Sequence, residues 1–141
     1  MAHHVLPASP ETCFWGYFAA DTAPVMRVAS GDEVTVEALP AGGLDDLHPD
    51  PARCLLEHRD TLEALEARKG PGVHIMNGPI HVEGAEPGDV LQVDILESRP
   101  RQDWGFAKII PLLGTLPEDF GAFRRWLIEL DLDAAEAELP W

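Results

Sequence analysis

Two stretches of the chain alternate between apolar and polar residues, which is the period of a β-strand with one buried face. Ser30–Glu37 opens with a Gly-Asp turn and then alternates, and Pro87–Ile95 repeats that order further along the chain. In the second stretch Leu91, Val93 and Ile95 share one face. We predict a strand in each stretch, and either coincidence or an internal structural repeat explains the recurrence.

The residues before the first alternating stretch extend its β character. Val5–Thr12 contains Pro7 and Pro10, which remove backbone donors and favour an extended, turn-rich start. Val25–Val28 then leads into Ser30–Glu37, and we predict that these two segments form a hairpin.

A helical period replaces the alternation between the two stretches. Asp50-Pro51 offers an N-cap followed by proline at the first helical position, and apolar residues then recur at helical spacing up to Gly70. This pattern predicts an amphipathic helix over about residues 51–69, with His58 at its polar edge.

The last part of the chain carries a second helical signal. Aromatic and aliphatic residues recur at three-to-four spacing from Phe120 to Leu130, which predicts a helix over about residues 119–130. Leu130–Asp133 also alternates like a strand, so the sequence leaves the end of this element open.

Composition and charge narrow the classes of function. The chain has 141 residues, enough for one domain, and its 25 acidic against 10 basic side chains give a formal charge of −15. This charge repels nucleic acid and anionic membranes, which excludes both as expected partners. No apolar run approaches the roughly 20 residues of a membrane span, and no secretory signal is visible, so we expect a cytoplasmic protein. Cys13 and Cys54 lack the number and spacing of a disulfide scaffold or a zinc site, and we interpret both as ordinary thiols.

The densest chemistry lies in Gly70–Asp89. Its five glycines and three prolines predict tight turns that let a ligand approach the backbone closely. His74, His81 and Glu83 are residue types that bind divalent metals or transfer protons, and the last two would share one face of a strand. A solvated strand face explains the same His-x-Glu pair.

Two further groups are candidates. Asp103-Trp104-Gly105 follows a basic spot at Ser98–Arg101, which indicates either a carboxylate pocket or a turn whose arginines pair with neighbouring acids. Trp15–Phe18 is either an aromatic wall for a small apolar substrate or a part of the core. Nucleophile-elbow, Walker A, dinucleotide-binding and zincin motifs are absent from the sequence, which disfavours those chemistries.

One string within Gly70–Asp89 is long and specific. It runs from His74-Ile75-Met76-Asn77-Gly78-Pro79-Ile80 into Val82–Asp89, and shorter strings of the same kind are His4–Leu6, Pro10–Thr12, Trp15–Phe18, Ser30–Asp32, Arg101–Gly105 and Leu116–Phe120. Through these strings the chain resembles the acetamidase/formamidase family over nearly its whole length, and corresponds to the N-terminal portion of that family. Asn77 stands where the family usually has threonine.

The resemblance implies a mainly β fold, with distorted β-sandwich or barrel-like sheets and one or two helices over about residues 51–69 and 119–130. We expect residues 1–141 to be one N-terminal domain, incomplete relative to full-length members. The resemblance also implies a hydrolase that converts short aliphatic amides such as formamide and acetamide to carboxylate and ammonia. It further implies a homo-oligomer and a divalent metal ion, with zinc expected before calcium.

The resemblance also assigns the site residues. His74 is the expected metal ligand, Glu83 a base or a second ligand, and Asp103 an orienting group. The backbone around Gly78 is expected to donate to the oxyanion, while metal-bound water would be the attacking group. The residues expected to bind the substrate are Trp15, Asn77, Gly78 and Trp104.

Two other functions stay open at this point. The chain is alternatively a truncated, inactive half that needs another half or another subunit, or a small-ligand-binding module that reuses the fold. Strand edges that carry Leu91, Val93 and Ile95 predict association with another chain if nothing covers them.

Overall fold

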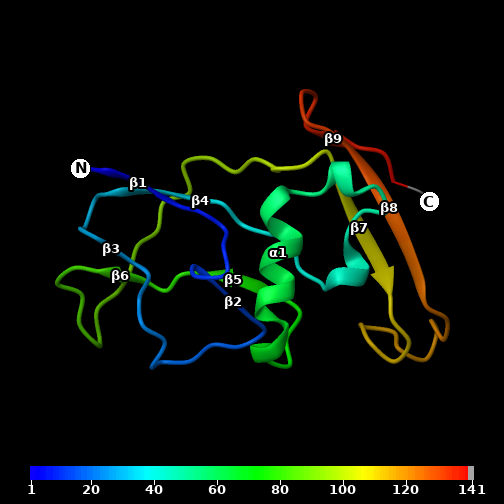
Figure 1. The fold of residues 1–141 in the computed structure, drawn as a ribbon, viewed down its shortest axis with the longest axis horizontal. Helices are drawn as coiled ribbons and strands as arrows, with labels where there is room; N and C mark the ends of the chain where they lie inside the picture. The colour runs from blue at the N-terminus through cyan, green and yellow to red at the C-terminus, as the bar shows by residue number, and fades with distance from the viewer. Residues whose placement is uncertain (140–141) are drawn as a thin grey trace. The chain divides into compact units, whose positions relative to one another are not determined.

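The computed structural model describes residues 1–139, which form two compact units (Figure 1). Unit 1 comprises Met1–Leu47 and Cys54–Ser98, and unit 2 comprises His48–Arg53 and the chain from Arg99 onward. The single N-terminal domain expected from the sequence stays a prediction, because two compact units can belong to one domain.

The fold is mainly β. Within residues 1–139, nine short strands form four small sheets, none of which closes into a barrel, and α-helix is confined to one segment. This confirms the mainly β class. No helix among these residues has the length and apolar character that a membrane crossing requires.

Unit 1 contains three two-stranded sheets, and each sheet joins segments that are distant in the sequence. The pairs are β1 (His3–Leu6) with β4 (Glu33–Val36), β2 (Cys13–Trp15) with β5 (Ile75–Asn77), and β3 (Met26–Val28) with β6 (Ile80–Val82). The β2–β5 pair is antiparallel, and the other two pairs are parallel.

The hairpin predicted from Val25–Val28 and Ser30–Glu37 is wrong. A turn does form, since the Asp32 N–H donates to the Ala29 carbonyl at 3.1 Å, but β3 and β4 leave it to pair with β6 and β1. Each strand is three or four residues long. Alternation predicts that a segment is extended, whereas the partner of so short a strand is decided by tertiary packing.

The helix predicted over about residues 51–69 is confirmed in place and is broken into three pieces. These are the 3₁₀ turns Pro51–Arg53 and Glu66–Arg68 on either side of α1 (Leu56–Leu65). The Asp50 carboxylate caps the first turn by accepting the Ala52 N–H at 2.9 Å, as its position before a proline predicts.

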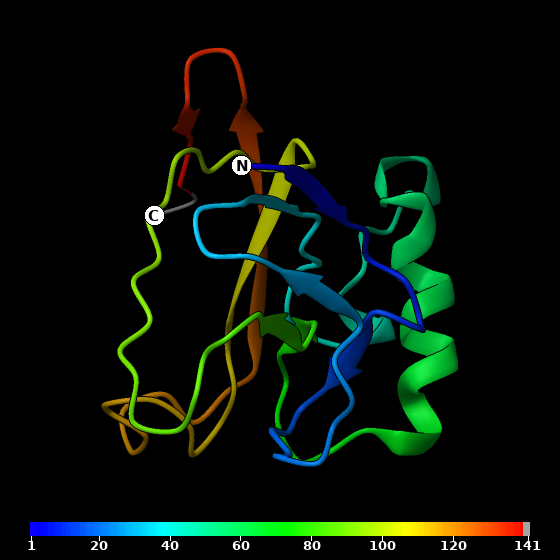
Figure 2. The ribbon, with the colours of Figure 1, turned by 90° about the vertical axis from the view of Figure 1, so that its left-hand side faces the viewer.

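Helix α1 packs on the strands of unit 1 through the core (Figure 2). Its buried residues are His58, Thr61, Leu62 and Leu65. The prediction that His58 lies at the polar edge is wrong, because its position three residues before Thr61 and seven before Leu65 places it on the buried face. The rest of the core is formed by Ala8, Cys13, Trp15, Leu39, Leu47 and Ile75.

Unit 2 is built on an antiparallel ribbon. Strand β7 (Trp104–Ile109) pairs with β8 (Arg124–Asp131), whose end pairs with β9 (Glu136–Ala137). The helix predicted over about residues 119–130 is therefore wrong. Phe106 lies opposite Leu127 across the ribbon, and such cross-strand apolar pairs stabilise a sheet that the helical count of apolar residues does not reveal.

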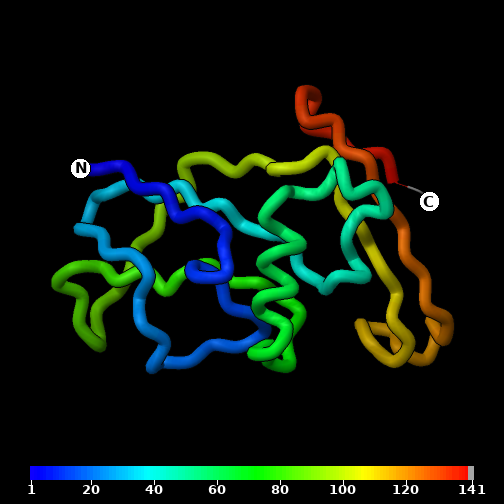
Figure 3. The backbone as a smooth tube through the Cα atoms, in the orientation of Figure 1, coloured from blue at the N-terminus to red at the C-terminus, as the bar shows by residue number. Residues whose placement is uncertain are grey.

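The strand predicted at Pro87–Ile95 is also wrong within the described residues. Its turn is present, since the Asp89 N–H donates to the Glu86 carbonyl at 3.1 Å, but Val90 to Ser98 has no helical or strand assignment. Figure 3 traces this run, in yellow-green, from β6 towards β7.

Candidate active site

Close contact between glycines positions the candidate loop on β2. The Gly16 N–H donates to the His74 carbonyl at 2.9 Å, and the Gly72 N–H donates to the Gly16 carbonyl at 3.0 Å. A β-carbon on Gly16 would lie 2.5 Å from the Gly72 oxygen, which is impossible without moving the backbone. The glycines thus allow the close approach of another backbone segment of the chain, whereas the close approach of a ligand stays a prediction.

Strand β5 ends at Asn77 and leads into a tight turn at Gly78. Gly78 has a φ of +118°, a left-handed conformation that favours glycine, and a cis peptide bond joins it to Pro79. The Gly78 N–H donates to the Thr12 carbonyl at 2.9 Å. That N–H is already engaged inside the fold, so Gly78 itself does not provide the expected oxyanion donor.

An open hollow of about 510 Å³ lies beside this turn in unit 1. Its walls are mostly apolar, and Asn77 is the polar side chain among them. The lining residues are Phe14, Phe18, Ala19, Ala20, Met76, Asn77 and Pro79. Phe14 and Phe18 meet edge to face with 6.3 Å between ring centroids. Of the predicted aromatic segment Trp15–Phe18, Phe18 thus lines the hollow, together with the preceding Phe14.

Asn77 is held by two contacts of its side-chain amide. Its Nδ2 donates to the Cys13 Sγ at 3.4 Å and to the Glu37 carbonyl at 3.3 Å. Burial raises the pKa of the Cys13 thiol, which keeps it protonated and makes it a poor nucleophile. With its N–H groups used in this way, the side-chain carbonyl oxygen is the acceptor that Asn77 has left to offer.

Trp15 occupies the core of unit 1. It is 1% exposed, and the Lys69 Nζ lies 3.9 Å from the centroid of its ring. Its role in binding substrate stays a prediction, but a buried ring that does not line the hollow offers no surface to a substrate. This position supports the alternative that Trp15 is part of the core.

His74 and Glu83 lie at the two ends of the candidate loop. His74 is exposed just before β5, and Glu83 is exposed in the turn after β6, where its N–H donates to the Val28 carbonyl at 2.8 Å. His81 lies between them on β6, opposite Arg27. Among residues 1–139, no group of three or more His, Cys, Asp or Glu side chains is arranged to hold a metal ion. The metal ion expected from the resemblance, with His74 as its ligand, therefore stays a prediction.

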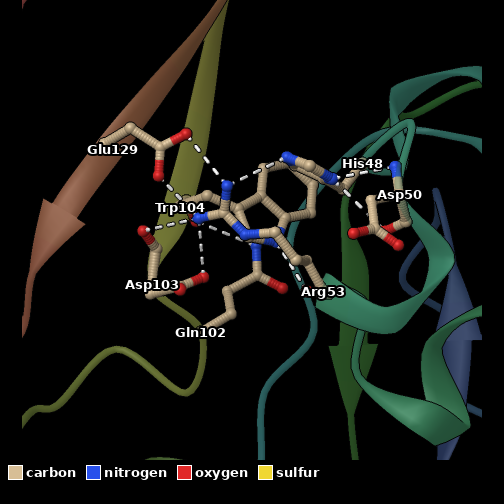
Figure 4. Close-up of polar contacts among 7 residues, drawn as sticks. All are labelled: His48, Asp50, Arg53, Gln102, Asp103, Trp104 and Glu129. Atoms are coloured by element: carbon tan, nitrogen blue, oxygen red, sulfur yellow. Dashed lines mark hydrogen bonds and ion pairs between the residues drawn. The ribbon is translucent and has the colours of Figure 1, made fainter.

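Asp103 belongs to an ion-pair cluster in unit 2 (Figure 4). The Arg53 guanidinium lies 2.9 Å from the Asp103 Oδ1 and 2.6 Å from the Glu129 Oε2, and its second nitrogen donates to the Glu129 Oε1 at 3.0 Å. The hydrogen bonds from Arg53 hold the pKa of Glu129 below its ordinary value, and the two carboxylates raise the pKa of Arg53. Asp103 is therefore paired with Arg53, a cation from a loop 50 positions earlier in the chain.

Trp104 fixes that loop to β7. The ring is 1% exposed, its Nε1 donates to the Arg53 carbonyl at 2.8 Å, and the His48 ring meets it edge to face at 5.1 Å (Figure 4). The Asp50 N–H in turn donates to the His48 Nδ1 at 3.0 Å. These contacts give Trp104 a structural role in unit 2, and its expected contact with substrate stays a prediction.

The predicted site residues thus fall in two groups. The hollow brings Asn77 and the turn at Gly78 together in unit 1, whereas Asp103 and Trp104 are joined in unit 2. Sequence reasoning missed Arg53 and Glu129, and no spacing could have found them, because they lie 76 positions apart. It also missed Phe14 and Met76. Because side chains alternate between the two faces of a strand, Phe14 lies on the face opposite its neighbour Trp15, and Met76 on the face opposite its neighbour Asn77. This alternation could have identified both residues.

Comparison with known proteins gives the relatives of the chain. A family model described as "Acetamidase/Formamidase family" matches residues 9–130. A formamidase of Methylophilus methylotrophus is 58% identical over 36 residues, which cover 24% of this chain and 9% of the relative. An acetamidase of Mycolicibacterium smegmatis is 47% identical over 45 residues, which cover 26% of this chain and 11% of the relative. The matches span between 9% and 14% of the length of these curated relatives and of a third, from Schizosaccharomyces pombe.

Proposed function

Because the chain belongs to the acetamidase/formamidase family, we propose that it forms part of an enzyme that hydrolyses short aliphatic amides to a carboxylate and ammonia. The observation that carries this proposal is the position of the hollow beside the most specific string of the sequence. Met76, Asn77 and Pro79, which belong to that string, line the hollow. The relatives named formamidase and acetamidase support the same class of substrate.

The hollow suits a small, mostly apolar ligand. Its volume of about 510 Å³ lies within the roughly 300–1,000 Å³ of small-molecule sites. Phe14 and Met76 offer apolar surface to a short alkyl group. Since a small ligand gains at most about 1.5 kcal/mol per non-hydrogen atom, an amide of about four such atoms binds with a Kd of roughly tens of micromolar at best, and never in the nanomolar range.

Asn77 supplies the discrimination that an amide substrate needs. Its side-chain carbonyl oxygen accepts a hydrogen bond from the NH₂ group of a primary amide, while its own N–H groups are held by Cys13 and Glu37. A carboxylate has no N–H to donate and would bring negative charge to that oxygen. The same contact therefore favours the amide substrate and disfavours the acid product.

Hydrolysis also needs an activated water, a donor to the oxyanion and an acid for the leaving nitrogen. Within the chain we assign proton transfer to His74 and Glu83, the exposed titratable groups that flank the turn. The oxyanion donor is another group than the Gly78 N–H, since that N–H donates to Thr12.

A second candidate function follows from the same geometry. No hydrogen bond found among residues 1–139 joins His74 to Glu83 or to a nucleophile. On this alternative the chain binds the amide but is inactive until groups from another polypeptide segment or subunit complete the site.

A titration separates binding from catalysis. We expect added acetamide to shift the NMR signals of the Met76 methyl group and the Asn77 amide, with saturation in the millimolar range. Asn77→Ala should weaken this binding about tenfold, or about 1.4 kcal/mol, and Gln92→Ala, on an exposed site elsewhere, should leave it unchanged. Absence of any shift at Met76, or equal binding by the Asn77→Ala variant, would refute the proposed site.

Ammonia release from formamide and acetamide then decides between the two candidates. If the chain is active alone, His74→Ala should lower kcat by about a hundredfold with little change in KM, as expected for a group used in proton transfer. Binding without ammonia release supports the inactive alternative.

A further inference from the structure

The hollow contains a cross-strand pair of half-buried apolar side chains. In the register of β2 and β5, Phe14 lies directly opposite Met76, and both residues line the hollow. Directly opposite residues of an antiparallel pair project from the same face of the sheet. Because methionine sulfur packs favourably against aromatic rings, this pair offers a binding surface for a flat ring as well as for an alkyl group.

The Phe14 ring lies near two further aromatic rings. Its centroid is 5.7 Å from that of Tyr17 and 6.3 Å from that of Phe18, with interplanar angles of 54° and 75°. Phe18 nevertheless stays 85% exposed. Aromatic rings gain from tilted and edge-to-face neighbours in addition to the area that they bury, so the uncovered surface of Phe18 favours a further ring beside it.

The size of the hollow exceeds what a short amide needs. Its volume of about 510 Å³ equals the space of roughly 15 to 20 water molecules in the liquid, and acetamide fills only a small part of it. Ala19 and Ala20 line its exposed side with methyl groups only, which keeps this room open. Apolar surface that acetamide leaves in contact with water is available to a larger acyl group.

We propose that the hollow binds the aryl group of an aromatic primary amide, of which benzamide is the simplest example. The inference rests on the proposed amide hydrolysis and extends its substrates beyond short aliphatic amides. The aryl ring packs on Phe14, Phe18 and Met76, while the amide group contacts Asn77, which follows Met76 in β5. Hydrolysis breaks the C–N bond of the amide and forms a C–O bond to the oxygen of a water. Both protons of that water pass to the leaving nitrogen, so the products are benzoate and ammonium.

Two physical reasons favour an aromatic group over an aliphatic group of similar size. A ring is rigid, whereas the chain of an amide such as heptanamide loses the freedom of several bonds when it binds. An aryl ring also interacts with the rings of Phe14 and Phe18 and with the sulfur of Met76 in ways that a saturated ring does not. Cyclohexanecarboxamide, which has as many carbon atoms as benzamide, therefore separates the aromatic contribution from that of size.

Titrations of the full chain, followed at the Met76 methyl signal, test this preference. Burial of an aryl group contributes about 10- to 100-fold in affinity, so benzamide should bind at least about tenfold more tightly than acetamide. Benzamide should also bind more tightly than cyclohexanecarboxamide, even though the saturated ring is the more apolar of the two. A smaller gain over acetamide would overturn the proposal, and so would equal or tighter binding of cyclohexanecarboxamide.

Removal of the exposed ring locates the bound aryl group. Phe18→Ala leaves the core intact, and it should weaken benzamide binding about fivefold or more while acetamide binding stays the same. Phe123→Ala, which removes an exposed ring in unit 2, is the matched control and should change neither. Phe18→Leu should lose the preference for benzamide over cyclohexanecarboxamide. Unchanged benzamide binding in Phe18→Ala, or an equal loss for acetamide and benzamide, would overturn the proposal.

The outcomes separate this inference from the proposed function. If acetamide binds in a way that depends on Asn77 and benzamide binds no more tightly, the proposed function stands and the aromatic preference is wrong. If neither amide shifts the Met76 methyl signal, the proposed site itself is wrong.

Discussion

The two Gly-Asp turns of unit 1 have the same local structure, but only the segment after the first turn pairs with another strand of the described residues. Gly31 and Gly88 both have positive φ, of +86° and +106°, and the aspartate after each accepts the N–H of the residue three positions earlier. After the first turn the chain pairs with β1, and after the second it pairs with nothing among residues 1–139. A short sequence can thus fix a turn and an extended direction, whereas a strand also requires a partner.

The largest expected difference between the two regions concerns their apolar side chains. Leu6, on the strand that covers β4, is 1% exposed, and Leu6→Ala should lower the free energy of unfolding by about 2–5 kcal/mol because it leaves a cavity. Val93→Ala in the unpaired run should change it by less than about 0.5 kcal/mol in dilute solution. Urea unfolding followed by circular dichroism measures both. Similar losses for the two variants would show that Val90–Leu96 is packed after all.

The two aspartates provide the next comparison. Asp32 accepts from the Ala2 and Ala29 N–H groups and contacts the His4 ring at 3.1 Å, whereas in the second turn Asp89 accepts from the Glu86 N–H. Asp32→Ala should therefore lower Tm by about 5 °C, and Asp89→Ala by less than about 2 °C. Thermal melts of the two variants check this order, and the reverse order would contradict it.

The Asp32 contacts also predict a pH dependence. The Ala2 N–H, with His4 and the Ala29 N–H as further contributors, lowers the pKa of Asp32 from 3.8 to about 2. A carboxyl whose pKa is lower in the folded state contributes stability that is present above pH 4 and is lost as the pH falls from about 4 to about 2. Asp32→Asn should remove this part of the acid transition, and Asp89→Asn should keep it. An unchanged transition in Asp32→Asn would contradict the account.

The smallest expected difference concerns the glycines. Nothing lies within 4 Å of a β-carbon on Gly31 or Gly88, so alanine costs only the strain of its positive φ, about 1 kcal/mol at each turn. Gly31→Ala should show that loss in global unfolding because β4 is paired. Gly88→Ala should show almost none, since its turn can relax without breaking a sheet. A full loss in Gly88→Ala would mean that the second turn unfolds together with the core.

The same distinction explains how much of the fold the sequence could predict. The segment at 51–69 was predicted as helix because Asp50 and Pro51 mark its start and its own residues form its hydrogen bonds. The helix at 119–130 was wrong because β8 depends on β7, which the spacing of Phe120 and Phe123 cannot report. Locally closed elements are predictable in this chain, and elements that need a remote partner are not.

The candidate site divides in the same way. The tight turn at Gly78 follows from glycine content and was predictable, whereas the contact of Gly72 with Gly16 depends on the fold. The pairing of Arg53 with Glu129 joins residues 76 positions apart, and only the fold brings them together. The engagement of the Gly78 N–H by Thr12 likewise depends on the β2–β5 sheet, which the sequence did not predict.

Amide hydrogen exchange, resolved by residue, tests the central claim most directly, namely that the first alternating segment has a partner within the chain and the second does not. In dilute solution we expect the amides that join β4 to β1 to be protected and those of Val90–Leu96 to exchange at nearly the rate of an unfolded peptide. Equal protection of both segments in dilute solution would contradict the account.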